Sequence, residues 1–103
     1  MPKVKWNAES DGTFSETALI MKLEKLGYRC THYTYPAGTE FPPHEHTVDK
    51  IDAVVKGKFR ITMDGESFIL EPGDYVVINR NTEHSAAVVG NDAVVSIDAI
   101  KNN

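Results

Sequence analysis

The pattern of hydrophobic and polar residues is helical from about residue 15 to residue 27 and strand-like after it. Leu19, Leu23 and Leu26 are spaced to form one apolar stripe along a helix. Ser15 is a good residue to cap the start of this helix, and Gly27 can end it. The sequence therefore predicts one N-terminal amphipathic helix, which packs on a sheet or covers the opening of a barrel.

The remainder of the chain reads as short strands separated by turns. Phe59, Ile61 and Met63 alternate with polar residues, as in a half-buried strand, and a hairpin turn signal, Asp64-Gly65, follows. The predicted strands span residues 28–35, 51–55, 59–63, 66–70, 75–78, 84–89 and 93–100. Residues 75–78 are almost wholly apolar, so we expect burial on both faces. Many short strands with frequent turns predict an all-β sandwich or small barrel.

Composition restricts the classes of partner. The 103 residues suffice for one domain, with an N-terminal segment and helix (1–27) before a β-barrel (28–100). The net charge of −4, without a block of lysine or arginine, argues against nucleic acid or an anionic membrane as a partner. No stretch of the sequence approaches the length of a membrane span. Cys30, the only cysteine, cannot form an intrachain disulfide, and this fits a cytoplasmic location.

Two closely spaced histidines carry the first chemical signal. His44 and His46 follow Pro42 and Pro43, which keep the backbone extended. Side chains two residues apart on an extended chain point to the same side, so the two imidazoles converge. Converging neutral imidazoles are typical of a metal site.

The spacing of glycines and histidines resembles the two motifs of the cupin family. The residues that match the first motif are Gly38, His44, His46 and Gly57. The second motif is matched by Gly73 and His84, with Asn79 for its proline, Asn81 for its second glycine and Val88 for its asparagine. The resemblance, which begins near Ala37, implies a jelly-roll-like cupin barrel. It also implies that His84 joins His44 and His46 inside the barrel to bind a divalent transition metal (Fe, Mn, Ni, Cu or Zn).

Lys50 stands where the family has a glutamate ligand, counted back from Gly57. An ammonium is repelled by a metal ion, so we expect Lys50 to turn outward and pair with Asp49 or Asp52. It could instead face inward to hold an anionic substrate, or replace the charge of the metal. Asp52 shares the strand face of Lys50, and Asp49 lies one residue early. Either acid is a further candidate ligand.

Other polar residues have simpler interpretations. Glu45 has the opposite strand parity to its neighbouring histidines and is expected to face outward or to support them. His32 is interpreted as a hydrogen-bonded structural residue, and Cys30 as an inert thiol. Tyr33 and Tyr35 are expected to pack, or else to line the mouth of a pocket.

The sequence contains no nucleophile–base pair or phosphate-binding loop, so any catalysis must come from the metal; catalytic residues are not identified. The resemblance implies dioxygenase, isomerase or lyase chemistry on a small organic molecule. The alternatives are a non-catalytic module that binds or senses a small ligand, with or without metal, and a structural remnant with an inactive site. Small cupins usually pair, so we also expect a homodimer.

Overall fold

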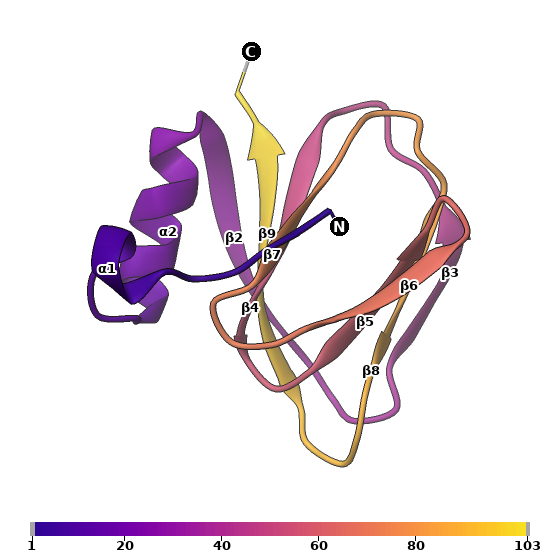
Figure 1. Ribbon diagram of the computed structural model, residues 1–103. Coiled ribbons are helices and arrows are strands. Elements are labelled where there is room, and N and C mark those ends of the chain that lie inside the picture. Colours follow the sequence, from indigo (N-terminus) through magenta and orange to yellow (C-terminus); the bar gives the residue numbers. More distant parts are fainter. Residues whose placement is uncertain (1, 103) are drawn as a thin grey trace.

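The computed structural model describes residues 2–102 and consists of two antiparallel β-sheets with two helices on one side (Figure 1). The elements, in chain order, are β1 (Lys3–Val4), α1 (Ala8–Asp11), α2 (Glu16–Lys25), β2 (Tyr28–Tyr35), β3 (Glu40–His44), β4 (Lys50–Lys56), β5 (Phe59–Met63), β6 (Glu66–Leu70), β7 (Tyr75–Ile78), β8 (His84–Val88) and β9 (Val94–Lys101). Among these residues, neither helix is long and apolar enough to cross a membrane.

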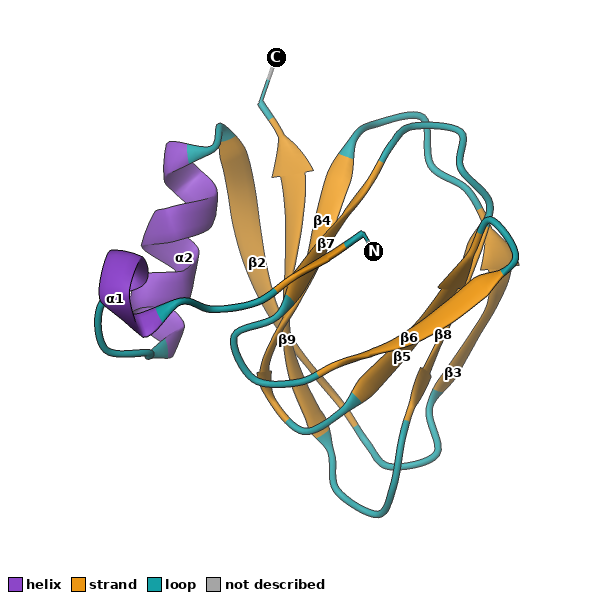
Figure 2. Cartoon of the chain, in the orientation of Figure 1, coloured by secondary structure: helices purple, strands orange, loops and turns teal. Residues whose placement is uncertain are grey.

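One sheet has the strand order β1-β7-β4-β9-β2 and the other the order β3-β8-β5-β6. The two sheets face each other, and no strand pairing closes them into a continuous ring among the described residues (Figure 2). The prediction of an all-β, jelly-roll-like fold with an N-terminal helix is confirmed.

The main core lies between the sheets. Side chains alternate along each strand, so every second residue points into this space. The buried residues that fill it are Val54, Phe59, Ile61, Met63, Phe68, Leu70, Val76, Ile78, Val88 and Val94. Tyr35, Phe41 and Ala86 are packed against them.

A second core lies between α2 and the outer face of the five-stranded sheet (Figure 2). Leu19 and Leu23 are fully buried there against Ile51 and Ile97. The strands β4 and β9 are therefore covered on both faces, one by the helix and the other by the second sheet. Of the two predicted roles for the helix, packing on a sheet is the one observed.

The ends of α2 follow the predicted capping residues. The Ser15 hydroxyl accepts a hydrogen bond from the Ala18 amide at 3.0 Å, which satisfies one free donor of the first turn. Gly27 has φ of +94°, a left-handed conformation that ends the helix. Leu26, at the C-cap, is 49% exposed, so its predicted place in the buried stripe is wrong. The helical period no longer holds where the chain leaves the helix.

Trp6 holds the N-terminal segment against the body of the domain. Its ring meets Phe14 edge to face, with centroids 5.2 Å apart. A Cβ atom on Gly73 would lie 2.7 Å from the Trp6 Cβ, so this close approach requires glycine. The sequence did not predict the short helix α1, which Asn7 caps by accepting from the amides of Glu9 and Ser10.

Most predicted strands match the structure to within a residue or two at each end, with two corrections. The segment that contains Pro42 and Pro43 forms the strand β3, whereas the sequence predicted only an extended backbone there. It is an edge strand, where prolines that lack an N–H are tolerated, and its register shifts between Phe41 and His44. In β7, Val77 is 38% exposed, so the prediction of burial on both faces is wrong.

We expect Leu23→Ala to destabilise the protein by about 2–5 kcal/mol, because it leaves a cavity between α2 and the sheet. Leu26→Ala is the matched control and should change stability by no more than about 0.5 kcal/mol, because Leu26 is already half exposed. Urea unfolding followed by circular dichroism measures both. Equal effects of the two changes would contradict the observed orientation of the helix.

Candidate metal centre

Three histidines converge at one end of the space between the sheets. His44 ends β3 and His84 begins β8, and the two residues are direct partners in the register of these strands. His46 lies just beyond the end of β3. Each residue offers one ring nitrogen, and these nitrogens lie within 4.8 Å of one another. The structure thus brings together the three residues that the sequence motifs suggested.

Backbone carbonyls orient two of the rings. Nδ1 of His44 is 2.7 Å from the Pro42 carbonyl oxygen, and Nδ1 of His84 is 2.9 Å from that of Thr82. A carbonyl oxygen only accepts, so Nδ1–H is the donor in both rings. This tautomer leaves the Nε2 lone pair free to bind a metal.

His46 supplies the observation that points most directly to a ligand. Its Nε2 atom is buried and has no hydrogen-bond partner among the described residues. Burial lowers the pKa of His46, and the nearby Lys50, His44 and His84 lower it further. A neutral imidazole with a buried, unpartnered nitrogen beside two other imidazoles is well suited to a metal ligand.

Two links hold the segment after β3 against the turn before β8. The Asn81 amide donates to the His46 carbonyl oxygen at 2.7 Å, and the Asp49 carboxylate accepts from the Arg80 amide at 2.8 Å. Asn81 has φ of +63°, which asparagine tolerates better than most residues. This explains why asparagine can stand where the family motif has glycine. Asp49 thus supports the loop and does not line the cavity beside the histidines.

A cavity of about 180 Å³ lies beside the histidines. The residues that line it are Tyr35, Phe41, His44, His46, Lys50, Asp52, Phe59, His84, Ala86 and Asp98. Tyr35 therefore lines the cavity, which is one of the two positions expected for the tyrosines. Tyr33 is 45% exposed, and its ring stacks on the ring of Tyr35.

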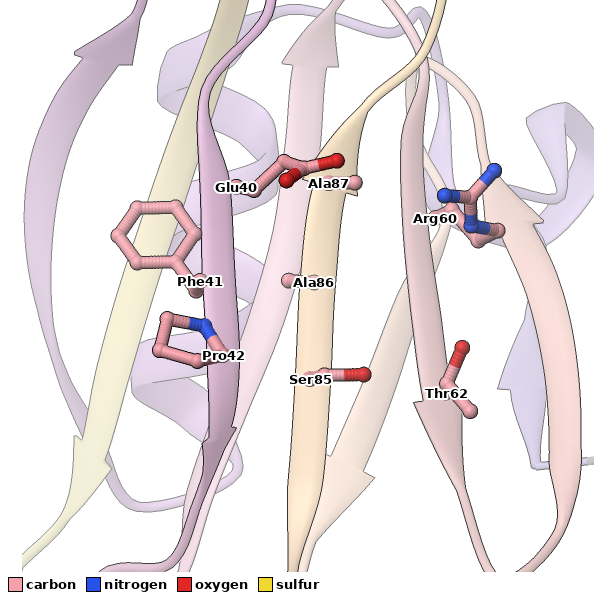
Figure 3. Close-up of a pocket in the computed structure, with 8 residues that line it drawn as sticks. All are labelled: Glu40, Phe41, Pro42, Arg60, Thr62, Ser85, Ala86 and Ala87. Atoms are coloured by element: carbon pink, nitrogen blue, oxygen red, sulfur yellow. The ribbon is translucent and has the colours of Figure 1, made fainter.

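A larger hollow of about 350 Å³ lies on the outer face of the four-stranded sheet (Figure 3). Short side chains of β8, Ser85 and Ala87, form its floor between Glu40 and Arg60. None of the three clustered histidines lines it. The smaller cavity is therefore the candidate site.

Lys50 faces this cavity and is 7% exposed. Its Nζ lies 3.1 Å from Oδ1 of Asp52 and 3.0 Å from each carboxylate oxygen of Asp98, and it donates to Asp98 Oδ2. The expected pairing with Asp52 is observed, but the expected outward orientation of Lys50 is wrong. A buried ammonium requires counter-charges, and Asp98 supplies one that the sequence analysis did not identify.

Asp98 is brought to Lys50 by strand register. Asp52 and Asp98 are direct partners on β4 and β9, so both side chains point into the cavity. Two carboxylates opposite each other repel, and the ammonium of Lys50 on the same face compensates them. The alternation of Val94, Ser96 and Asp98 in the sequence indicated a common face for these residues, but no local signal showed which face.

The surroundings change the pKa values of the charged lining residues. Burial alone would lower the pKa of Lys50, but Asp52 and Asp98 together raise it, so the ammonium stays charged. Burial raises the pKa of Asp52; Lys50 opposes this shift and Asp98 adds to it. Burial, with Asp98 and Asp52, raises the pKa of Tyr35 to about 12, so its hydroxyl keeps its proton.

The remaining candidates lie outside the cavity. Nδ1 of His32 is 2.8 Å from Oε2 of Glu16 on the outer surface, in agreement with its interpretation as a hydrogen-bonded structural residue. Burial raises the pKa of Cys30, which fits an inert thiol. Glu45 is exposed, as its strand parity predicted.

Residues 31–100 match the family described as "Cupin domain". The chain belongs to the cupin family. The match covers most of the chain and both histidine motifs, so the resemblance read from the sequence is confirmed. A comparison with curated proteins found no match.

Solved cupin structures are similar to this one. The structure of KdgF from Halomonas sp. is 28% identical, with a TM-score of 0.64 over 75% of this chain and 71% of that chain. The DMSP lyase DddQ from Ruegeria pomeroyi is 20% identical, with a TM-score of 0.66 over 75% and 39%. A salicylate 1,2-dioxygenase from Pseudaminobacter salicylatoxidans is 23% identical, with a TM-score of 0.64 over 73% and 21%. This cupin thus aligns with well under half of either enzyme, and at these identities the likeness to them shows the fold alone.

We expect Lys50→Met to destabilise the chelator-treated protein by about 3 kcal/mol at neutral pH, because it leaves two carboxylates without their counter-ion. The loss should shrink as the pH falls to about 4.5. Burial then favours protonated Asp52 in the folded state, and protonation removes the unpaired charge.

Lys58→Met is the matched control, because Lys58 forms only an exposed pair with Glu71 at 3.9 Å. It should cost no more than about 1 kcal/mol at either pH. Urea unfolding at the two pH values measures both variants. If Lys50→Met lowered the free energy of unfolding equally at both pH values, Lys50 would not be compensating the charge of the two carboxylates.

Proposed function

We propose that this cupin binds one divalent transition metal through His44, His46 and His84. The observation that carries the proposal is the convergence of three ring nitrogens, one of them a buried Nε2 atom of His46 without a partner. Three neutral imidazoles suit Fe, Mn, Ni, Cu or Zn and leave coordination positions open for a ligand.

The residues around the histidines support this role. A bound metal would act as a Lewis acid toward an oxygen of a small ligand. The carbonyls of Pro42 and Thr82 hold two imidazoles in the metal-binding tautomer. Phe41 and Phe59 line the same cavity and give it an apolar surface. Lys50, held by its two acids, keeps its proton and is not a ligand.

The ligand set supports metal-dependent chemistry on a small organic molecule, of the dioxygenase, isomerase or lyase type. Structural neighbours include a dioxygenase and a lyase, but their likeness to this chain concerns the fold. The second candidate is a non-catalytic cupin that binds or senses a small ligand. It is favoured by Lys50, whose ammonium faces the cavity at the position of the family's acidic ligand.

We also propose a cytoplasmic homodimer. The location rests on the single cysteine. The dimer rests on β2, which pairs only with β9 and so has one unpaired edge among the described residues. This strand is eight residues long, and Arg29 is its only permanently charged residue. A long, weakly charged edge is a suitable surface for pairing with a second copy.

The metal proposal predicts about one divalent ion per chain, with affinity that falls as the pH drops through about 6.5, because protons compete for the imidazoles. The lowered pKa of His46 delays its protonation to lower pH. His84→Ala should weaken binding at least about tenfold, or about 1.4 kcal/mol. His32→Ala is the matched control, because His32 lies away from the cluster.

Competitive titration with a chromophoric chelator measures the metal affinity of the wild type and of both variants. A wild-type protein that stays metal-free after dialysis against iron, manganese, nickel, copper and zinc in turn would refute the proposal.

The dimer proposal predicts twice the monomer mass by light scattering at roughly tens of micromolar protein. Tyr33→Lys places a charge on the exposed edge strand β2 and should shift the protein toward monomer. Val77→Lys, on a strand that is paired on both sides, should leave the mass unchanged. A wild-type monomer would count against the proposal.

A further inference from the structure

The cavity has two walls of different chemistry, and they belong to different sheets. His44 and His84 project from β3 and β8 of the four-stranded sheet. Lys50, Asp52 and Asp98 project from β4 and β9 of the five-stranded sheet. A molecule in the cavity therefore has the imidazoles on one side and the charged cluster on the other.

In the charged cluster, hydrogen-bond acceptors outnumber donors. Two carboxylates have four oxygens, whereas the ammonium of Lys50 has three N–H donors. The ammonium lies within 3.1 Å of Oδ1 of Asp52 and of both oxygens of Asp98, and it donates to Oδ2 of Asp98. Oδ1 of Asp98 forms an ion pair with Nζ at 3.0 Å but accepts no hydrogen bond among the described residues. The wall therefore favours a ligand group that donates and disfavours one that only accepts.

Of the two acids, Asp98 is the better placed to meet a ligand. The Asp52 side chain is 10% exposed and pairs with the buried ammonium. The Asp98 side chain is 27% exposed and lines the same cavity. Both acids pair with the ammonium of Lys50, which can balance the charge of only one of them, and Asp98 is the more exposed of the two.

We propose that the cavity binds a small bifunctional molecule, with an oxygen group at the histidine wall and a protonated amine or hydroxyl group that donates to Asp98. This inference rests on the proposed metal site, which would hold the oxygen end. A volume of about 180 Å³ corresponds to about six water molecules, so the ligand is small. Lys50 then acts as a counter-ion for the acids and not as an anchor for an anion.

The test uses protein loaded with Co²⁺, whose visible spectrum reports both metal binding and ligands that reach the metal. β-Alanine and butyrate are the main probes, because they have the same carboxylate and the same number of non-hydrogen atoms. At the end opposite the carboxylate, β-alanine carries an ammonium group and butyrate carries a methyl group. β-Alanine should bind at least about tenfold more tightly than butyrate, and succinate, with a second carboxylate, should bind more weakly than butyrate.

Two variants identify the group responsible. Asp98→Asn should abolish the preference for β-alanine over butyrate. Asp92→Asn, an equal change of charge in an exposed turn outside the cavity, should preserve it. A preference that survives Asp98→Asn would overturn the inference, because it would show that the amine binds the metal directly.

The outcomes separate this inference from the metal proposal. Absence of a Co²⁺ spectrum in the wild-type protein would refute the metal site itself. A normal Co²⁺ spectrum with equal binding of β-alanine and butyrate would leave the metal site intact and overturn the role of Asp98. The wild-type comparison needs no variant, so it decides the question even if Asp98→Asn fails to fold.

Discussion

The alternation of side chains along β4 and β9 is the constraint on which the rest of the structure depends. Ile51 and Ile97 point toward α2, whereas Lys50, Asp52 and Asp98 point into the cavity. Moving either strand by one residue would place charged groups beneath the helix and apolar groups in the cavity. The packing of the helix and the composition of the site are therefore set by the same register.

The histidine cluster depends on the opposite sheet and on the loops at its end. The pairing of β3 with β8 places His44 directly beside His84. His46 lies beyond this pairing and is held by the Asn81 amide, while Asp49 ties the same loop to Arg80. Residues outside the ligand set thus restrain the third imidazole. In metal sites the loss of such supporting contacts typically weakens metal affinity by about 10–100-fold.

Lys50 gives this cupin a cavity with an unusual distribution of charge. In the family motif an acidic ligand stands at this position, so negative charge is placed next to the metal. Here an ammonium stands at that position, and Asp52 and Asp98, on the same sheet, pair with it. A metal held by three neutral imidazoles would keep its full charge on one side of the cavity, with carboxylates on the other. Such a separation favours ligands that are themselves polarised.

The sequence by itself determined the features that depend on local order. The helix and most strands follow from hydrophobic periodicity and capping residues, and the motif spacing indicated His44, His46 and His84 as candidate metal ligands. Tertiary structure alone decided the orientation of Lys50, because an ammonium can be buried only where counter-charges meet it. One of those charges, Asp98, lies 48 residues away in the chain and reaches Lys50 through the pairing of β4 with β9. Periodicity shows which residues share a face, but the partner strand and its register decide what that face meets.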